Sequence, residues 1–204
     1  MRILAIDTAT DESAVALHVD GAIEDRAVTW RSAFRETAPA ALELLRRSGI
    51  GWRDLDGIAV PAGPGSFTGL RIGAALALGI AELRGLPLFA PSTLAVVAEA
   101  AAPGGARRVL ATLDARRGRR YAAVLERKGS AWSVIEGPVD VEADAAEGWA
   151  PDLAHARLES PRPGGSPAAA LARLVAAAPD AYRLATPSDL RIAYARPATD
   201  PPPR

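Results

Sequence analysis

The sequence predicts an α/β fold made of two lobes with the same order of strands, and three observations support this prediction. Short continuous apolar runs such as Ile3–Ile6 are typical of strands buried on both faces. Segments with helical periodicity and capping residues alternate with these runs. A pattern of strand, acid, turn, strand, hairpin and strand occurs twice, beginning at Ile3 and again at Val109.

The first lobe is expected to cover residues 1–102 and to open with three strands, at residues 3–6, 13–19 and 22–29. A polar turn, Asp7-Thr8-Ala9-Thr10-Asp11, joins the first two strands. Asp20-Gly21 separates the second and third strands, and this dipeptide favours a two-residue hairpin.

Helices and two further strands complete the first lobe. An amphipathic helix is predicted over Thr37–Arg47, with Leu42, Leu45 and Ile50 on one side and Gly49 after its end. A buried strand follows at residues 55–60, and a Gly- and Pro-rich loop at residues 61–69. The remaining elements are a long helix capped by Thr68 and closed by Gly85, a strand over 86–90 and a helix over 92–101 capped by Ser92.

The second lobe is expected to cover residues 103–204, because Pro103-Gly104-Gly105 marks a boundary. The strands of this lobe are predicted at residues 109–113, 121–126 and 131–139, with a hairpin turn at Lys128-Gly129. A helix is predicted over 166–178. Residues 142–163 carry no clear pattern, and the Pro-rich end from Pro197 is expected to fray.

Composition excludes several functional classes. The chain has 24 basic and 24 acidic residues, so a protein that grips nucleic acid by itself is not indicated. Cysteine is absent, and the only histidines are His18 and His155, so a metallopeptidase or a Cys-based zinc site lacks its ligands. No signal peptide or membrane span is indicated, and we expect a cytoplasmic protein without a metal.

The segment GPGSFTGLR at residues 63–71 is the most informative loop. Its glycines permit positive φ angles and close approach, and it opens a helix whose N–H groups could bind an anion or a partner. The alternative is a tight strand-to-helix turn in which the glycines serve packing alone. It matches neither GxGxxG nor a P-loop.

The helix that follows carries small residues at intervals of four, Gly69, Gly73 and Ala77. Such spacing lets another backbone approach closely. This face could pack on the chain's own sheet or dock a partner helix, and the sequence leaves both readings open.

Asp7, Thr8 and Asp114 stand at strand ends, where acids could bind Mg²⁺ or orient a phosphate. The duplicated strand–acid–hairpin pattern is the layout of actin-like ATPases and sugar kinases. In those folds the turn after the first acid usually contains a glycine, whereas residues 7–10 contain none. The other reading is that each aspartate stabilises a turn.

Arginines at residues 107–108 and 116–120 form the one local basic cluster. It could contact an RNA backbone or could be a solvated turn.

Five segments together resemble the TsaB family: ILAIDTAT at 3–10, GPGSFTGLRIG at 63–73, PSTLAVVA at 91–98, LDARRGRRYAAVLE at 113–126 and DLRIAYARP at 189–197. The resemblance implies a duplicated actin-like fold (ribonuclease H-like, ASKHA) with a degraded nucleotide cleft. It also implies a non-catalytic scaffold that activates the paralogous enzyme TsaD, with the ATPase TsaE, in forming threonylcarbamoyladenosine on tRNA. Such proteins also form homodimers when alone.

The resemblance assigns two sets of residues. The surface for TsaD or a second copy would include Leu42, Ser66, Phe67, Thr68, Gly69, Leu70, Arg71, Gly73 and Ala77. A vestigial nucleotide site would include Asp7, Thr8, Gly65 and Ser66, with ATP or ADP bound only weakly at a partner interface. Family members often carry a histidine near the start of the first helix, and residues 32–37 contain none.

An independent ATPase or small-molecule kinase of the actin-like superfamily is the alternative function. It rests on the duplicated strand–acid pattern, and the missing turn glycine argues against it.

Overall fold

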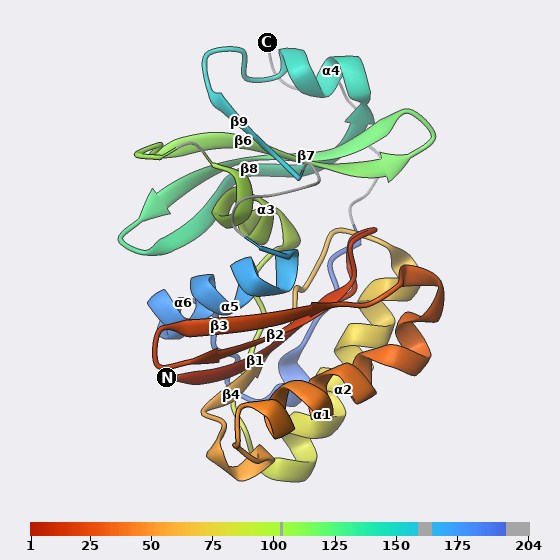
Figure 1. Cartoon of the computed structure of the whole chain (residues 1–204). Helices are drawn as coiled ribbons and strands as arrows, with labels where there is room; N and C mark the ends of the chain where they lie inside the picture. The colour runs from red at the N-terminus through yellow and green to blue at the C-terminus, as the bar shows by residue number, and fades with distance from the viewer. Residues whose placement is uncertain (103, 159–164, 195–204) are drawn as a thin grey trace.

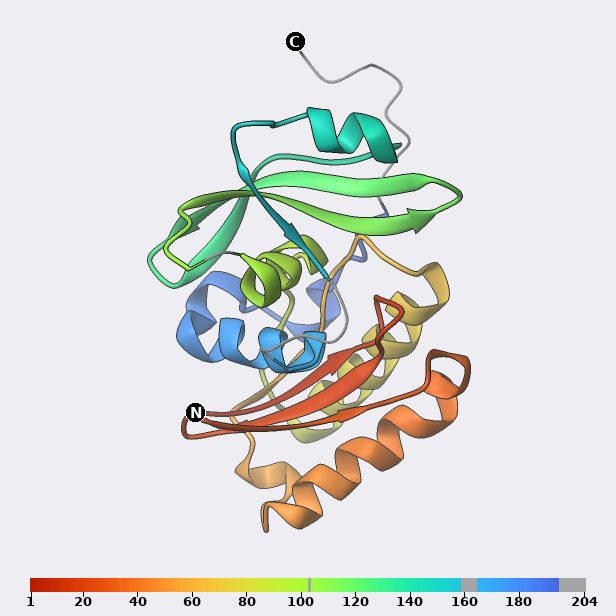
Figure 2. The same cartoon turned by 45° about the horizontal axis from the view of Figure 1, so that its top comes forward.

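Two β-sheets lie one above the other, with helices between them and on their outer faces (Figure 1). The structure, a computed structural model, describes residues 1–102, 104–158 and 165–194. Figure 2 shows the same layers from a tilted direction, with α3 and α5 again between the sheets. The predicted α/β fold with two similar halves is confirmed.

The first sheet has the strand order β3-β2-β1-β4-β5. Its strands are β1 (Arg2–Asp7), β2 (Ala14–Val19), β3 (Ala22–Ala27), β4 (Gly57–Ala59) and β5 (Leu88–Phe89). β1, β2 and β3 form an antiparallel meander, and β4 and β5 extend it in parallel. Asp20 and Gly21 both have positive φ angles in the turn between β2 and β3, as the predicted hairpin requires.

The second sheet repeats this order as β8-β7-β6-β9. Its strands are β6 (Arg108–Arg116), β7 (Arg119–Lys128), β8 (Ala131–Glu142) and β9 (Ala154–Arg157). β6, β7 and β8 are antiparallel, and β9 lies parallel to β6 as β4 lies parallel to β1. The predicted duplication is therefore present, and β9 comes from the stretch in which the sequence showed no pattern.

Six α-helices and three short 3₁₀ helices belong to the described residues. The α-helices are α1 (Ala33–Arg47), α2 (Phe67–Arg84), α3 (Thr93–Ala101), α4 (Ala143–Gly148), α5 (Pro167–Ala177) and α6 (Pro179–Tyr182), and the 3₁₀ helices are Trp30–Ser32, Trp52–Asp54 and Pro187–Asp189.

Both sheets bury both faces. Along β1, Ile3 and Ala5 join the core between the sheets, whereas Leu4 and Ile6 join the core beneath α1 and α2. Along β6, Val109 faces the core between the sheets, and Leu110 faces a smaller core under α4. This alternation explains the continuous apolar runs, since adjacent side chains point to opposite and equally buried sides.

The helices between the sheets each pack against the sheet of the other half of the chain. α3, from the first half, packs against β6 and β9 of the second sheet, and α5, from the second half, packs against β1 and β2 of the first. The backbone of Arg183 also bridges to Phe89, and Ala193 N donates to the Ala62 carbonyl at 2.7 Å. The strands of the two sheets come from either side of residue 103, and residues 165–194 return to the first sheet. The division into lobes at 1–102 and 103–204 stays a prediction.

The start of α1 differs from the prediction. It begins at Ala33, four residues before Thr37, and Thr37 donates its hydroxyl to the Ala33 carbonyl at 2.6 Å inside the helix. The buried residues of this first turn are small, so no apolar periodicity marks the start of the helix. Leu42 and Leu45, expected on one side of this helix, differ in exposure: Leu42 is 52% exposed, whereas Leu45 is buried.

The cap of α2 also differs. Ser66, not Thr68, is the N-cap residue, and its hydroxyl accepts the Gly69 N–H at 3.2 Å. Gly85 closes the helix in the left-handed conformation, and Ser92 caps α3, both as predicted. The expected fraying from Pro197 lies outside the described residues. Within the described chain, no helix combines the length and hydrophobicity needed to cross a bilayer.

Candidate functional site

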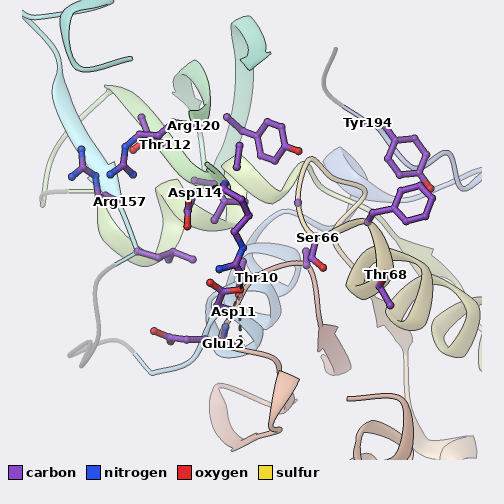
Figure 3. A pocket seen from close by; sticks show the side chains of 18 residues that line it. Thr10, Asp11, Glu12, Ser66, Thr68, Thr112, Asp114, Arg120, Arg157 and Tyr194 are labelled. Atoms are coloured by element: carbon purple, nitrogen blue, oxygen red, sulfur yellow. Dashed lines mark hydrogen bonds and ion pairs between the residues drawn. The ribbon is translucent and has the colours of Figure 1, made fainter. Parts of the chain in front are cut away.

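A cleft of about 780 Å³ opens where the two sheets approach each other. Three turns supply most of its wall: the β1–β2 turn, the loop before α2 and the β6–β7 turn, joined by the end of β9 (Figure 3). Asp11 and Glu12 lie on one side of the cleft, Thr112, Arg120 and Arg157 on another, and Ser66, Thr68 and Tyr194 on a third.

The loop before α2 is tightly joined to the β1–β2 turn. The Ser66 N–H donates to the Ala9 carbonyl at 2.8 Å. A Cβ at Gly65 would lie 2.5 Å from the same carbonyl oxygen, so only glycine fits there. The Ala9 carbonyl therefore occupies a place that a phosphate on this loop would need.

The start of α2 is held in the same way. The Thr8 hydroxyl donates to the Gly69 carbonyl at 2.6 Å, and a Cβ at Gly69 would lie 1.8 Å from the Thr8 carbonyl oxygen. Asp7 is fully buried, and its Oδ1 accepts the Ala9 N–H at 2.9 Å. Both side chains thus act in the turn and in its packing against α2.

The proposed vestigial nucleotide residues are therefore divided by the structure. Gly65 and Ser66 line the cleft, whereas Asp7 and Thr8 lie outside its wall, buried beneath the turn. Since two N–H groups at this helix start, those of Ser66 and Gly69, already have acceptors, the loop offers few donors to an anion.

Asp114 occupies the corresponding place in the second sheet. Its Oδ1 accepts the Arg116 N–H at 2.8 Å, the same bond to the residue two positions ahead that Asp7 makes. The turn-stabilising reading of both aspartates is supported by this repeated hydrogen bond. Unlike Asp7, Asp114 is exposed and lines the cleft. Arg116 pairs with Asp11 and so connects the turns of the two sheets.

An apolar groove of about 480 Å³ lies between α1 and α2 and adjoins the cleft at Phe67 and Thr68. Phe34 of α1 is 82% exposed and Phe67 of α2 is 55% exposed. Both line the groove, with Ile72 and Leu76 deeper between the helices. Phe34 was missed by the sequence analysis because its helix was predicted to start later.

A stack of three side chains forms one end of this groove. The Arg71 guanidinium lies 3.7 Å from the centre of the Phe67 ring, and the Phe67 and Tyr194 rings are 5.3 Å apart. Arg71 also donates from Nε to the Tyr194 hydroxyl at 3.1 Å. The C-terminal segment thereby holds Phe67 and Arg71 in place at the groove.

The predicted partner-interface residues fall into two groups. Leu42, Ser66, Phe67, Thr68 and Arg71 are exposed. Gly69, Leu70, Gly73 and Ala77 are buried against the chain's own sheet, where a Cβ at Gly73 would lie 2.6 Å from the Thr8 hydroxyl oxygen. The stripe of small residues is therefore explained by close packing of α2 on the end of β1, and a partner cannot touch it directly.

The histidines do not meet in space. His18 makes a 2.8 Å hydrogen bond through Nδ1 to the Met1 carbonyl, and His155 is exposed on β9 of the other sheet. Among the described residues, no group of three or more His, Cys, Asp or Glu side chains could hold a metal ion.

Comparison with known proteins identifies the family. The family model described as "TsaD: tRNA N6-adenosine threonylcarbamoyltransferase" matches residues 29–184, more than half of the chain. The chain belongs to the TsaD family. The resemblance to its TsaB members is also confirmed: the protein named tRNA threonylcarbamoyladenosine biosynthesis protein TsaB in Escherichia coli is 43% identical over 62% of this chain and 56% of its own length.

Other relatives include both TsaB proteins and threonylcarbamoyltransferases. The TsaB protein of Bacillus subtilis is 33% identical over 63% of this chain and 56% of its own length. A tRNA N6-adenosine threonylcarbamoyltransferase of Caulobacter vibrioides is 31% identical over 45% of this chain and 31% of its own. The chain spans about half the length of the TsaB relatives that it matches.

A solved structure has the same fold. YeaZ from Pseudomonas aeruginosa superposes with a TM-score of 0.75 and 24% identity, covering 95% of this chain and 99% of that one. At this identity the likeness establishes the architecture, including the two sheets and the helices between them.

Proposed function

We propose that this chain is a non-catalytic scaffold subunit in the formation of threonylcarbamoyladenosine beside the anticodon of tRNA. In this proposal it binds the TsaD-like catalytic paralogue and holds it in its active conformation. The effect is a population shift, driven by tighter binding to the active state than to the inactive one. The names of the TsaB relatives support the pathway, and the groove between α1 and α2 supports the mode of action.

The exposed groove is the observation that carries the proposal. Two large aromatic side chains, Phe34 and Phe67, are exposed beside a hollow lined mostly by apolar groups of two neighbouring surface helices, α1 and α2. Contiguous exposed apolar surface of this kind commonly marks a protein interface. A helix pair from a partner with the same fold would fill the groove by packing between α1 and α2.

The proposal includes three kinds of partner. The TsaD-like paralogue would occupy the groove in the working complex, and a second copy would occupy it when the chain is alone. A TsaE-like ATPase would join the pair, and tRNA would contact the chain through the complex. The balanced charge of 24 basic and 24 acidic residues suits such indirect contact in the cytoplasm.

Reconstitution tests the function. The chain would be combined with a TsaD-like subunit, a TsaE-like ATPase, the adenylate-forming enzyme, ATP, threonine, bicarbonate and unmodified tRNA, and the modified nucleoside measured by mass spectrometry. We expect modification to require the chain and the chain alone to have no activity. Equal modification without the chain would contradict the proposal.

The surface is tested by Phe34→Glu, with Ile135→Glu as the matched control. Phe34 lies in the first turn of α1, where an acidic side chain suits the helix dipole, so the fold is expected to persist. Ile135, 45% exposed on β8, receives the same charge on the other sheet. We expect Phe34→Glu to weaken binding of the chain to the TsaD-like subunit about 100-fold, as loss of a buried aromatic anchor does. Ile135→Glu should leave this binding unchanged. Equal pairing by both variants, measured by analytical ultracentrifugation, would reject this surface.

The alternative of an independent ATPase or kinase makes the opposite prediction for the chain alone. The close packing of Gly65 and Ser66 against the Ala9 carbonyl argues against this alternative, because it leaves no space for a phosphate between the loop before α2 and the β1–β2 turn. ATP hydrolysis by the purified chain without partners, above the rate of a matched blank, would favour this alternative over the scaffold.

A further inference from the structure

We propose that Thr112, Arg120 and Arg157 form a subsite for the phosphate group of a small molecule, at the end of the second sheet. This site is separate from the groove between α1 and α2, and it does not depend on the scaffold proposal. It lies in the same cleft as the loop before α2, where the sequence analysis placed a vestigial nucleotide site, but on a different wall.

The strand register brings the three side chains together. Thr112 on β6 and Arg157 on β9 are direct partners in the parallel ladder. Arg120 on β7 is two positions from Ala122, the antiparallel partner of Thr112. Side chains at such positions share one face of a sheet, and Figure 3 shows all three on the same side of the cleft.

Two buried polar atoms in this group have no hydrogen-bond partner. Thr112 is 1% exposed and belongs to the residues that line the cleft, and its buried hydroxyl has no hydrogen-bond partner. The Nε of the partly buried Arg120 is also buried without an acceptor. Since buried polar groups in native proteins are nearly always bonded, two such groups on one wall indicate a ligand that supplies acceptors to both.

Three carboxylates, those of Asp11, Glu12 and Asp114, line the same cleft as the subsite. Asp114, opposite Arg120, accepts the Arg116 N–H with Oδ1, and within the described chain it forms no ion pair with Arg120. Asp11, across the cleft, pairs with Arg116. Within the described chain Arg120 forms no ion pair, so its guanidinium can meet an incoming anion.

A phosphate fits this donor set better than a carboxylate does. A carboxylate is planar and is satisfied by the fork of one guanidinium, whereas a phosphate has three outer oxygens that point in different directions. Guanidinium groups on two strands and a hydroxyl between them match that distribution. A cleft of about 780 Å³ exceeds the size of inorganic phosphate and suits a phosphorylated small molecule, with Leu113 and Tyr121 as part of its wall.

The test measures binding of inorganic phosphate to the full chain by isothermal calorimetry at constant ionic strength. Arg120→Gln should weaken binding about tenfold or more, as loss of a charge-assisted hydrogen bond does. Thr112→Val should weaken binding about threefold to tenfold, and it should raise the melting temperature of the free protein because it removes an unsatisfied hydroxyl. Arg107→Gln makes the same charge change on an exposed residue before the far end of β6 and should bind like the wild type.

Adenosine monophosphate and adenosine distinguish the source of the phosphate. Tighter binding of the monophosphate than of inorganic phosphate would support an organic phosphate, and equal binding would support free phosphate. Three results would overturn the subsite: no saturable binding up to about 10 mM phosphate, equal losses in Arg120→Gln and Arg107→Gln, or adenosine binding as tightly as its monophosphate. All measurements use the chain alone, so failure of the scaffold proposal would not affect them.

Discussion

The glycines of α2 differ in their surroundings although they share one helix. A Cβ at Gly69 would lie 1.8 Å from the Thr8 carbonyl oxygen, which is a backbone atom that cannot turn away. A Cβ at Gly79 would meet nothing within 4 Å. Glycine is thus required at the first position for close approach and is merely tolerated at the second.

This contrast predicts opposite effects of one substitution. Gly69→Ala should lower the free energy of unfolding by about 3 kcal/mol or more, because the backbone at the end of β1 must shift. Gly79→Ala should raise it by about 0.5–1 kcal/mol, since alanine is the better helix former. Urea denaturation followed by circular dichroism measures both, and equal midpoints for the two variants would contradict the packing described for α2.

The buried phenol of Tyr182 predicts that the stability of the protein depends on pH. Its hydroxyl accepts the Trp132 N–H at 2.7 Å and donates to the Trp132 carbonyl at 3.2 Å. Burial raises the pKa of Tyr182 from 10.0 to about 12, with a smaller opposing effect of the bond from Trp132. Between these values the unfolded chain loses the phenol proton while the folded chain keeps it, so stability should fall as pH rises through this window.

Tyr182→Phe separates this contribution from the rest. It should lower the free energy of unfolding by about 1–3 kcal/mol at neutral pH, because the buried backbone N–H of Trp132 loses its acceptor. From pH 10 to 12 the variant should lose less stability than the wild type does. Parallel stability curves for the two proteins across that range would show that the phenol ionises with an ordinary pKa.

At the scale of elements, the start of α2 depends on one side chain that the sequence did not single out. Ser66 and Thr68 are both good capping residues two positions apart, and both lie before a helix-forming run. The carbonyl of Ala9 fixes Ser66 through its N–H, and Ser66 then accepts the Gly69 N–H. A contact with a distant turn therefore selects the cap.

Replacing each hydroxyl tests this assignment. Ser66→Ala should reduce the free energy of unfolding by about 1 kcal/mol through loss of the cap, and Thr68→Ala should change it by less than about 0.5 kcal/mol. Chemical denaturation of the two variants gives the comparison. A larger loss for Thr68→Ala would mean that the helix starts where the sequence alone placed it.

At the scale of the whole molecule, the two halves exchange helices. α3 leaves the first sheet to pack under the second, and α5 leaves the second half to pack on β1 and β2. The largest core is formed from both halves of the chain, with Ile3 and Val109 in the same cluster. Neither half can bury its sheet alone, because each sheet receives a covering helix from the other half.

A split chain tests this dependence. A fragment of residues 1–102 should not unfold cooperatively alone, since it lacks the helix that covers β1 and β2. Mixing it with a fragment of residues 104–204 should restore a folded complex that elutes at the size of the intact chain. Cooperative unfolding of the first fragment by itself, observed by calorimetry, would contradict the shared core.

The sequence determined the strands other than β9, the hairpins, the duplication and the family, because these depend on local patterns: apolar runs, turn dipeptides and the GPGSFTGLRIG motif. The tertiary structure decided which surfaces are exposed. Gly73 and Ala77 are buried while Phe34 is exposed, since the direction of a helix face depends on the sheet beneath it. It also joined Thr112 and Arg157, 45 positions apart, because only the parallel pairing of β6 with β9 makes them neighbours.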